Sequence, residues 1–596
     1  MRCPKPAGLV WLLLLALPVA CQHHAHDARQ VGPPVVDQPV TLDNSGEADP
    51  IANPAALHGG TYFTWGGEFP KSLNVWLDDN SFSEQISGMM FEPLLGMHPV
   101  KNEPVGILAD SWEISPDKKT YTFKINPNAQ WSDGQPVTAG DIQFYYDVIM
   151  NPKNLTSIFR VDLSRFKRPE VIDAKTVRIT ATEAHWKNFW AAGGFTALPQ
   201  HAWKDLDFNQ INFDFPVVSG PYRIYEVKNG RSVILQRRAD WWGRARRINQ
   251  YKFNFDYLVY RSMEDRTKAL EVLKRGDFDA YPLYTVRIWM QQTNFPQVQK
   301  NWVLRQNLYN QSPKGFQGFA INLRRPQFQD VRVREALAHL LNRELMLQKL
   351  MFNQYFLLNS YYPDLYPNNL RPNTPLTDYN PEKARQLLKE AGWKVDTDGV
   401  LKKDGKPFEL VILHSGEDLP HLVIYLEDLK AVGIQARIDK VSGATHTKRV
   451  DEHDFDLVWR NWGGGRLRDP EPMWHSKTAD DVATQNTPGV KDPEIDRLIE
   501  AQKLEMNVDT RNDILRKIED RLLTLKPYIL LWQSDHTRLL HWNRFGTPKT
   551  VLDKFGGEDA APVYWWIDPK KSAALDEAMR TGQSLPAEPT EVHYSE

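Results

Sequence analysis

Two hydrophobic periodicities alternate along the chain after its first fifty residues. Apolar side chains recur at every second position in residues 112–114 and 121–125, and the SPDKK segment between them supplies a turn. This stretch therefore predicts a hairpin with one buried face. A second pair of strands is predicted by SGPYRIYEV at 219–227 and by Val233 and Leu235. Both patterns are typical of antiparallel sheets.

The later half of the chain follows a different order. The apolar run LVIL at 410–413 predicts a strand, the spacing of Leu422, Leu426 and Leu429 predicts a helix, and IQARI predicts another strand. Gly433 suits the C-cap between that helix and the second strand. A strand, a helix and a strand in succession indicate a βαβ unit.

Three more helices have recognisable starts. Asp330 can cap one helix, and the pairs Asn380-Pro381 and Asp492-Pro493 open two others, because Asn and Asp accept bonds from free N–H groups while proline fits the first turn. No internal repeat of fixed period is found. We therefore expect a mixed α/β body.

A glycine run interrupts the pattern at RNWGGGRLRDP, residues 460–470. It follows an apolar stretch, from Phe455 to Trp459, that predicts the end of a buried strand. Three consecutive glycines lose much backbone freedom on folding, so such a run is usually kept where the chain bends sharply or another backbone approaches. The run is therefore a candidate binding element.

The first 21 residues form a secretory signal, with a short basic start, an apolar core and small residues before Cys21. Val19, Ala20 and Cys21 resemble a lipoprotein cleavage box, which makes Cys21 the candidate for lipidation. Pro18 occupies the place of the usual leucine, so ordinary cleavage stays open. Both cysteines lie in this leader, and the mature chain can form no internal disulfide.

The length and net charge of the chain indicate how many domains it has and which kinds of ligand it can bind. A chain of 596 residues is too long for one core and predicts two or three domains. A net charge of −2 argues against nucleic-acid binding, which needs a basic excess. We expect residues 22–56 to form a flexible tether, and we interpret its histidines at 22–30 as solvated rather than metal-binding. No later apolar run reaches the length of a membrane span.

Catalytic signatures were sought and not found. The sequence has no G-x-S-x-G elbow, no H-E-x-x-H motif, no Gly-rich phosphate loop and no cysteine nucleophile in the mature chain. A secreted hydrolase is therefore the weaker class. The 20 tryptophans keep sugar binding open, because aromatic faces stack on pyranose rings.

Several blocks together resemble the extracellular solute-binding proteins, family 5, which are the peptide-capturing components of ABC importers. The blocks are LADSWEISPDKKTYTFKINPNAQWSDGQPVTAGDIQFYYD, SGPYRIYEV with DWWG, FQDVRVREALAHLLNRE and YNPEKARQLLKEAGW, in the family's order. The length and the C-terminal YWWID look most like a branch associated with oligopeptides and microcin C. The resemblance implies a periplasmic monomer that has no cofactor or metal and works with an inner-membrane permease.

The resemblance also implies a clam-shell of two α/β lobes with an extra inserted domain. We place the signal at 1–21, the tether at 22–56 and the inserted domain at 95–215. The remaining ranges are listed together: the first lobe at 57–94, 216–315 and 531–568, the second lobe at 316–530, and a C-terminal tail at 569–596. A peptide or peptide-like ligand is expected between the lobes, with an oligosaccharide or another small solute as the alternative.

The glycine run matches a W-x-x-D element of the family. Trp462 matches the tryptophan, but Gly465 stands where the family has the aspartate that pairs with a peptide's amino group, although Asp469 could substitute. From the residues themselves, Gly463, Gly464 and Gly465 would admit an extended ligand backbone, and Arg466 or Arg468 could pair with a carboxylate or phosphate. The alternative is a sharp surface turn with solvated arginines and a core tryptophan.

Further candidate residues carry less specific signals. They are Asn80, Ser81 and Phe82 after PKSLN, Trp65 beside two glycines, Tyr361 and Tyr362 before a proline, and His414 at the end of a strand. Ligands in α/β sheets lie beyond the carboxyl ends of strands, which favours His414. For each residue, ordinary packing or a plain surface loop is the alternative.

Overall fold

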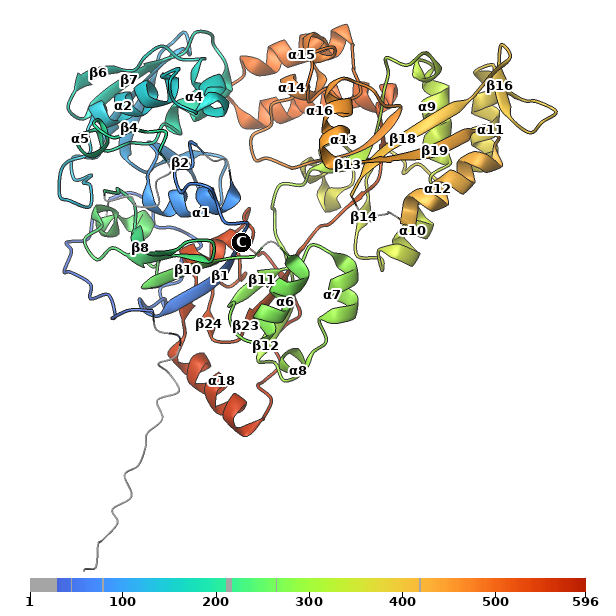
Figure 1. The fold of residues 1–596 in the computed structure, drawn as a ribbon. Coiled ribbons are helices and arrows are strands. Elements are labelled where there is room, and N and C mark those ends of the chain that lie inside the picture. Colours follow the sequence, from blue (N-terminus) through green and yellow to red (C-terminus); the bar gives the residue numbers. More distant parts are fainter. Residues whose placement is uncertain are drawn as a thin grey trace, which may run out of the picture.

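The computed structural model describes residues 29, 31–43, 45–77, 80–210, 217–263, 265–416 and 420–595. The signal sequence and Cys21 lie outside these ranges. The fold is mixed α/β and two-lobed (Figure 1). A third body, built around the inserted segment, lies beside the second lobe and above the first in that view.

The first lobe contains two four-stranded sheets. One has the order β1, β10, β9, β8, and the other β11, β23, β12, β26. Their bounds are β1 Thr61–Gly67, β8 Tyr222–Lys228, β9 Ser232–Arg237, β10 Tyr257–Ser262, β11 Ala280–Pro282, β12 Val303–Tyr309, β23 Thr537–Trp542 and β26 Glu591–His593. The helices are α1 Ser81–Met90, α6 Arg266–Lys274, α7 Val286–Gln292, α8 Pro296–Gln299, α17 Ala561–Tyr564 and α18 Pro569–Thr581. The predicted pairing of β8 with β9 is antiparallel and confirmed.

The inserted body has one antiparallel sheet with the order β4, β5, β7, β6. Its elements are β2 Leu95–Met97, β3 Pro104–Gly106, β4 Ala109–Ile114, β5 Thr120–Ile125, β6 Glu170–Asp173, β7 Thr176–Thr180, α2 Ala139–Met150, α3 Ser157–Leu163, α4 Trp186–Gly193 and α5 Gln200–Trp203. The predicted hairpin is confirmed, because β4 pairs with β5 and Trp112 lies opposite Phe123.

The second lobe is built on a five-stranded sheet with the order β19, β18, β20, β13, β21. Its strands are β13 Phe316–Ile321, β18 Glu409–Ser415, β19 Gln435–Val441, β20 Leu457–Trp462 and β21 Tyr528–Leu530. Its helices are α9 Val331–His339, α10 Arg343–Leu350, α11 Pro381–Glu390, α12 Pro420–Ala431, α13 Gly443–Asp451, α14 Glu471–Trp474, α15 Pro493–Lys503 and α16 Val508–Leu525. Further short strands lie in the second lobe and in the first lobe: β14 Phe356–Leu357, β15 Lys394–Val395, β16 Leu401–Lys403, β17 Lys406–Pro407, β22 Trp532–Gln533, β24 Phe545–Gly546 and β25 Trp566–Ile567.

The βαβ unit and the helix caps agree with the sequence. Strands β18 and β19 are parallel and α12 connects them. The side chains of Asp330, Asn380 and Asp492 accept backbone N–H bonds at the starts of α9, α11 and α15. These polar caps confirm that local capping chemistry fixed where the three helices begin.

The chain passes between the lobes twice. Residues 310–315 connect β12 of the first lobe to β13 of the second, and residues 534–536 lead from β22 back to β23. We call 310–315 the first crossing segment. Within the described ranges, no helix is both long enough and apolar enough to span a membrane.

The predicted tether is not loose where the structure describes it. Val35 N–H donates to Asp256 Oδ2 at 3.1 Å, and Asp37 pairs with Arg237 at 2.5 Å. Asp49 is buried and accepts a bond from the Tyr564 hydroxyl at 2.9 Å. Hydrogen bonds and an ion pair hold this segment on the first lobe, and hydrophobic periodicity gives no signal for such contacts.

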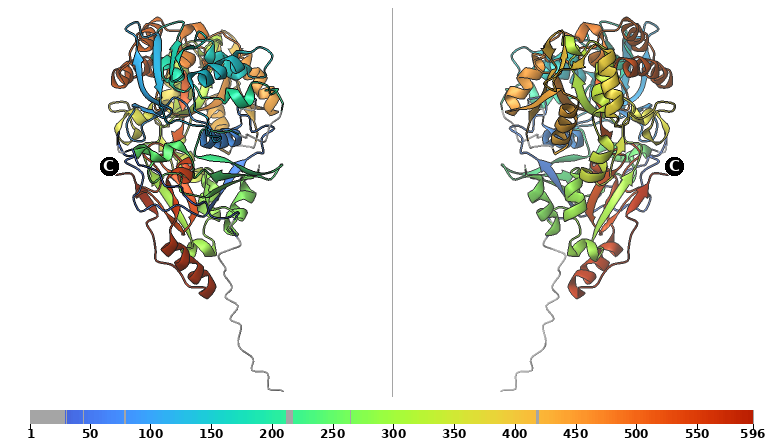
Figure 2. Two further views of the ribbon diagram at one scale, coloured as in Figure 1. Left: turned by 90° about the vertical axis from the view of Figure 1, so that its left-hand side faces the viewer. Right: turned by 90° about the vertical axis from the view of Figure 1, so that its right-hand side faces the viewer.

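Two smaller expectations also differ from the structure. Phe455 and Leu457 are buried as predicted, but Trp459 is 41% exposed and β20 runs on to Trp462. The segment expected to be a C-terminal tail forms α18 and then strand β26, which pairs in parallel with β12. Helix α18 lies at the end of the molecule opposite the second lobe (Figure 2).

Candidate ligand-binding cleft

The glycine run meets the chain's own first crossing segment. A Cβ added at Gly464 would lie 2.5 Å from the carbonyl carbon of Pro313, and one at Gly315 would lie 1.6 Å from the oxygen of Trp462. The expected close approach therefore exists, but at Gly464 the approaching backbone belongs to the protein and not to a ligand. The space beside Gly463 is open, and a Cβ at Gly465 would lie 3.3 Å from the Leu467 oxygen.

Trp462 ends β20 and is half-buried. Its Nε1 donates to the Tyr528 hydroxyl at 3.0 Å, and the Arg460 guanidinium lies 4.8 Å from its ring centroid. These contacts fix the orientation of the indole ring. The Trp462 side chain is thus held in a fixed orientation at the end of β20 in the second-lobe sheet.

Arg466 joins three parts of the molecule. Its Nε donates to Asn102 Oδ1 at 3.1 Å, and its guanidinium also donates to the carbonyl of His98 at 2.8 Å. The same guanidinium stacks on the first-lobe ring of Phe555, 4.0 Å from its centroid. Burial lowers the pKa of Arg466 to about 10, so the side chain remains charged at neutral pH.

Arg468 is held differently, because its guanidinium pairs with Asp364. Burial raises the pKa of this carboxyl group, and Arg468 opposes that rise. Its backbone carbonyl also accepts a bond from Gln502 Nε2 at 2.9 Å. Of Arg466 and Arg468, only Arg468 forms an ion pair with a carboxylate of the residues that the structure describes.

A cavity of about 610 Å³ opens beside these arginines, and we call it the interlobe cavity. All three bodies contribute to its wall. The lining consists of Val100 and Asn102, the first crossing segment at 310–314, residues 364–366, 368 and 369, Arg466, Arg468, Asn512, and Lys554 with Phe555. A site whose walls come from separate bodies can change shape when they move, as ligand capture by closure requires.

The charges in this wall are unbalanced. Its cations are Lys314, Arg466, Arg468 and Lys554, and its only carboxylate is Asp364. Burial lowers the pKa of Lys314, whose backbone N–H bonds the Asp364 carboxylate but whose ammonium makes no hydrogen bond or ion pair with any residue that the structure describes. Sequence reasoning did not identify Lys314 or Lys554. Both lie close to glycines, at PKG and KFGG, but this local pattern does not distinguish them from other surface lysines.

Three candidates near the start of the first lobe have structural roles. The Asn80 side chain accepts the N–H of Phe82 at 2.8 Å and caps α1, while Ser81 is exposed. Phe82 is fully buried beneath Gly66. Trp65 donates from Nε1 to the carbonyl of Met263 at 2.7 Å. None of these residues lines the interlobe cavity.

Tyr361, Tyr362 and His414, the further candidates in the second lobe, also lie outside the residues that line the interlobe cavity. The Tyr362 hydroxyl accepts a bond from Trp474 Nε1 at 3.0 Å. Tyr361 is 2% exposed and packs edge-on against Phe316, 5.1 Å between centroids, with Trp474 and Tyr528 nearby. It is therefore a core aromatic that no ligand can stack on without repacking. His414 is half-buried near the end of β18.

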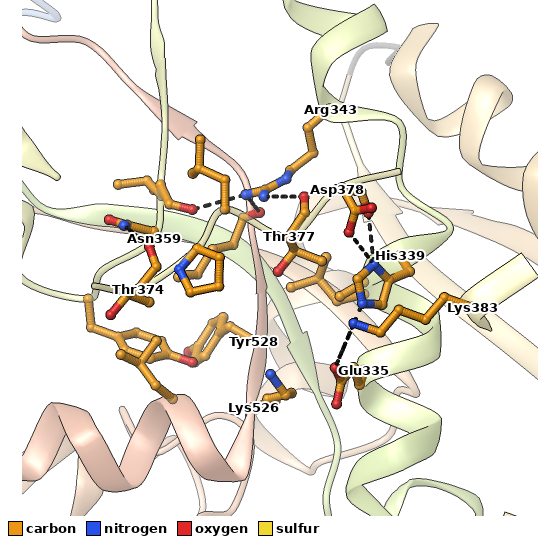
Figure 3. Close-up of a pocket in the computed structure, with 18 residues that line it drawn as sticks. Glu335, His339, Arg343, Asn359, Thr374, Thr377, Asp378, Lys383, Lys526 and Tyr528 are labelled. Carbon is orange, nitrogen blue, oxygen red and sulfur yellow. Dashed lines mark hydrogen bonds and ion pairs between the residues drawn. The ribbon is translucent and has the colours of Figure 1, made fainter. Parts of the chain in front are cut away.

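A smaller pocket of about 260 Å³ lies wholly within the second lobe (Figure 3). Arg343 is buried beside it and donates to the carbonyls of Leu358, Leu530 and Thr377 at 3.0, 2.9 and 2.8 Å. Because Arg343 bonds carbonyls of separate segments, its role is to hold the lobe together. This pocket has no wall from the first lobe.

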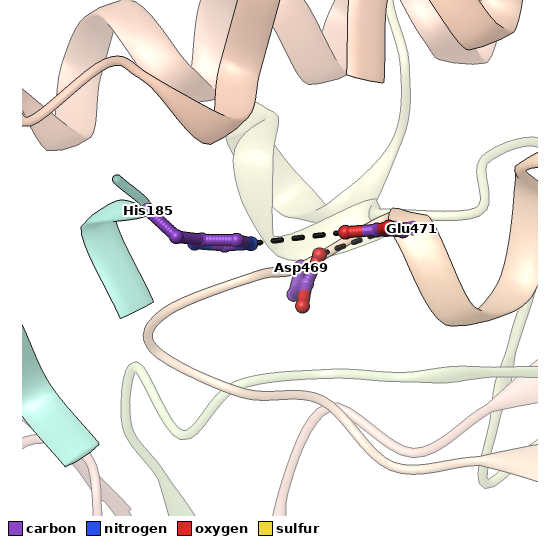
Figure 4. Close-up of side chains that lie close together, drawn as sticks. All are labelled: His185, Asp469 and Glu471. Atoms are coloured by element: carbon purple, nitrogen blue, oxygen red, sulfur yellow. Dashed lines mark hydrogen bonds and ion pairs between the residues drawn. The ribbon is translucent and has the colours of Figure 1, made fainter. Parts of the chain in front are cut away.

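Acidic and basic side chains form a second junction between the inserted body and the second lobe (Figure 4). His185 Nε2 lies 3.8 Å from Glu471 Oε2, and Lys187 lies 3.6 Å from Asp469. Lys477 and Lys503 also pair with Glu471. We call these six residues the ion-pair cluster. The pKa of Glu471 is held well below its usual value, first by His185 and then, against the effect of burial, by the lysines.

The ion-pair cluster has the composition of a metal site but not the chemistry. Asp469, Glu471 and His185 offer ligand atoms within 4.8 Å of one another. However, His185 Nδ1 accepts the backbone N–H of Lys187 at 3.0 Å, so in the neutral ring Nε2 carries the proton and has no lone pair for a metal. Lysines already balance both carboxylates. The arrangement is an electrostatic junction.

Comparisons with known proteins agree with this architecture. A family model described as bacterial extracellular solute-binding proteins, family 5 middle, matches residues 103–483. The chain is 25% identical over 507 residues to the probable peptide-binding protein YejA of Agrobacterium fabrum, covering 77% of this chain and 81% of that one. It is 26% identical over 494 residues to the peptidoglycan-binding protein YepA of the same organism, covering 75% and 79%. Among solved structures, the oligopeptide-binding protein AppA of Bacillus subtilis, in complex with a nonapeptide, has 21% identity, a TM-score of 0.63, and coverage of 86% and 100%.

Proposed function

Because this chain belongs to the family 5 bacterial extracellular solute-binding proteins, we propose that it captures peptides or peptide-like solutes between its lobes for an ABC importer. Members of the family are binding proteins that work with ABC permeases. The observation that supports capture here is the interlobe cavity, whose wall combines both lobes and the inserted body. Such a site allows the closed state to contact the ligand better than the open state.

We infer that the protein binds its solute without chemical turnover. The described wall of the interlobe cavity holds Asp364 as its one carboxylate, and that carboxylate is paired with Arg468. General acid–base catalysis needs a group placed to exchange protons with the substrate. A peptide library recovered uncleaved after incubation with the protein is the expected result, and cleavage that a point mutation abolishes would contradict it.

A peptide is favoured over an oligosaccharide by the kind of wall that the cavity offers. Amide and hydroxyl groups and cations dominate it, whereas only Tyr366 and Phe555 are aromatic. Sugar sites generally need flat aromatic faces that are free to stack, and Phe555 is already covered by Arg466. The similarity to a probable peptide-binding protein supports the same choice.

The test is identification of bound molecules. Small molecules released by denaturing the purified protein are analysed by mass spectrometry, and peptides or peptide conjugates are expected. In parallel, a bound ligand should stabilise the protein by about 2.7 kcal/mol at 100 times Kd, measured as a shift in Tm. Release of neutral oligosaccharides alone would contradict the peptide proposal.

We also propose the domain division derived from the sequence: a first lobe of 57–94, 216–315 and 531–568, an inserted domain of 95–215 and a second lobe of 316–530. The main sheets fall within these ranges, apart from β26, which joins a first-lobe sheet from the segment at 569–596. Limited proteolysis should cut first near these boundaries.

Export and lipid anchoring are further parts of the proposal. We propose that the mature chain lies in the periplasm as a monomer, attached to the membrane through Cys21. Metabolic labelling with a fatty acid is expected for the wild type and not for Cys21→Ser. The length of the chain and its YWWID segment also support the branch associated with oligopeptides and microcin C, which competition between microcin C and a peptide would test.

A further inference from the structure

We propose that the interlobe cavity recognises an anionic group of its ligand, a carboxylate or a phosphate, and that Lys314 is the cation that contacts it. This inference rests on the proposed function, because it names the chemistry of the ligand in the same site. It goes beyond family membership, because relatives show only that some solute is bound.

The first argument is the charge balance of the wall. Among the described lining residues, four side chains carry positive charge and one carries negative charge. Arg468 and Asp364 neutralise each other. The acceptors of Arg466 in its hydrogen bonds are an amide oxygen and backbone carbonyls, so it has no bonded carboxylate among the described residues, and Asp553 favours its charged form only from a distance. The cavity therefore keeps an excess of positive charge.

The second argument concerns Lys314 itself. It lies on the first crossing segment, between Pro313 and Gly315, and its ammonium has no bonded partner among the described residues. Burial penalises the charged form of this side chain, while Asp535 and Asp364 favour it from a distance. A buried charge without a counter-ion is costly to a folded protein unless a partner arrives. An anionic ligand is such a partner.

The third argument is the supply of neutral donors. Asn102 uses its side-chain oxygen to accept from Arg466, which leaves the Nδ2 amide free to donate. The Asn512 side chain also lines the cavity. Amide donors beside an ammonium suit the several oxygens of a carboxylate or phosphate. Among the described lining residues the one carboxylate, Asp364, is paired with Arg468 through Oδ2.

The position of Lys314 links recognition to closure. The first crossing segment joins the lobes, and Gly464 of the second lobe packs directly on the backbone of Pro313 and Lys314. An anion held by Lys314 therefore lies where the lobes meet, within the wall shared with Arg466 and Lys554. A ligand anion that neutralises Lys314, Arg466 and Lys554 together favours the closed arrangement of the lobes, in which these cations lie close to one another.

The experiment uses the full mature protein and pools of short peptides analysed by native mass spectrometry. One pool has free C-terminal carboxylates, a second has the same sequences as C-terminal amides, and a third is the amide pool carrying one phosphoserine. We expect the acid and phosphoserine pools to be retained at least tenfold more than the plain amides. Retention of only one anionic pool identifies that anion as the source.

Variants locate the preference. Lys314→Met should reduce the preference for anionic peptides to below about threefold, and Lys314→Arg should keep most of it. Lys430→Met is the matched control, because Lys430 is an exposed lysine on α12, away from the cavity. An unchanged Tm shows that each variant is folded. Equal retention of acids and amides by the wild type, or an unchanged preference in folded Lys314→Met, would overturn the inference.

Failure of the proposed function gives a different result. If no peptide pool is retained, acidic oligosaccharides are compared with neutral ones of the same length. Retention of the acidic sugars, lost in Lys314→Met, supports anion recognition and removes the peptide proposal. No retention of any anionic pool overturns the inference.

Discussion

Two of the places where the second lobe meets the rest of the protein differ in how their charges are balanced. At the ion-pair cluster, cations and carboxylates alternate, and His185 and Glu471 have side chains 4% and 16% exposed. At the interlobe cavity, cations gather around about 610 Å³ of space with one paired carboxylate. The first place is complete without a ligand, whereas the second leaves charge to be neutralised.

The carboxyl groups at the two places show the same contrast. Glu471 is stabilised as an anion, so its pKa is held well below the usual value. Asp553, beside the cavity residues Lys554 and Phe555, has its pKa raised to about 6, chiefly by burial. At a junction that holds two bodies together, the charged side chains are paired with one another. At a site that captures a ligand, some charges are left for the ligand to pair with. The following experiments test that distinction, beginning with the largest expected effect.

Removing the carboxylate of Glu471 should damage the ion-pair cluster most. Glu471→Ala leaves Lys477, Lys503 and His185 without their shared anion, and we expect the free energy of unfolding to fall by about 3 kcal/mol. Thermal unfolding measures the change. Glu500→Ala is the control, because that side chain is 55% exposed and should cost less than about 1 kcal/mol. Equal effects in both variants would argue against a tight junction.

The contact between the glycine run and the first crossing segment can be broken by one methyl group. Gly464→Ala forces a Cβ to within 2.5 Å of Pro313 and should cost about 2 kcal/mol of stability. Gly463→Ala is the matched control, since a Cβ there meets nothing within 4 Å. Chemical unfolding of both variants checks the pair. If Gly463→Ala is the more harmful change, the close neighbour is not the crossing segment.

Lys314→Met should leave ligand-free stability unchanged or raise it by up to about 1 kcal/mol, because an apolar side chain replaces a buried charge without a bonded partner. This outcome is opposite in direction to that of Glu471→Ala. Thermal unfolding without ligand measures it. A loss as large as that of Glu471→Ala would show that the protein itself neutralises Lys314.

The raised pKa of Asp553 predicts a pH dependence of binding. Above a pH of about 6 this group becomes an anion near Arg466, so affinity for an anionic peptide should fall a few-fold between pH 5 and 7. Burial also raises this pKa from 3.8, the ordinary value of an aspartate, to about 6 in the folded protein, so the folded state keeps the proton to a higher pH and the stability that this group contributes is lost as pH rises through that window. Calorimetry with Asp553→Asn should give a flatter profile, and an unchanged profile would assign the effect elsewhere.

The smallest expected effect is that of the ligand's amino group. The cavity's carboxylate is paired, and Asp469 is engaged by the N–H of Glu471 at 3.1 Å and by Lys187 at 3.6 Å. An N-acetylated peptide should therefore bind within about threefold of its free-amine parent, or less than 1 kcal/mol apart. A hundredfold preference for the free amine in calorimetry would show that an acid serves as its anchor.

Local sequence patterns predicted the helix caps and the βαβ unit well. Asp330 and Asp492 cap their helices, and Gly433 ends the βαβ helix with a φ of +88°. Each of these features depends on neighbours within a few residues. A single sequence reveals such features because they concern hydrogen bonds along one turn.

The candidate site was predicted only in part, because it depends on contacts across the chain. Arg466 and Arg468 do line the interlobe cavity, whereas Trp462 and the three glycines are not among its lining residues. The contact that places Arg466 there, its bond to His98, spans a separation of 368 residues. Nothing near Lys314 in the sequence shows that its ammonium lacks a partner. The sequence left Tyr361 open between ligand contact and core packing for the same reason, since its aromatic neighbours Phe316 and Trp474 come from distant segments.

The contact of Gly315 with Trp462 limits which substitutions the protein can accept during evolution. Any side chain at position 315 would collide with a backbone oxygen at 1.6 Å, which no rotamer relieves. In a saturation-mutagenesis library selected for uptake, codon 315 should therefore retain only glycine, while codon 463 accepts alanine freely. Other residues around the cavity can be exchanged to alter the ligand that the protein carries, but glycine at position 315 must be kept.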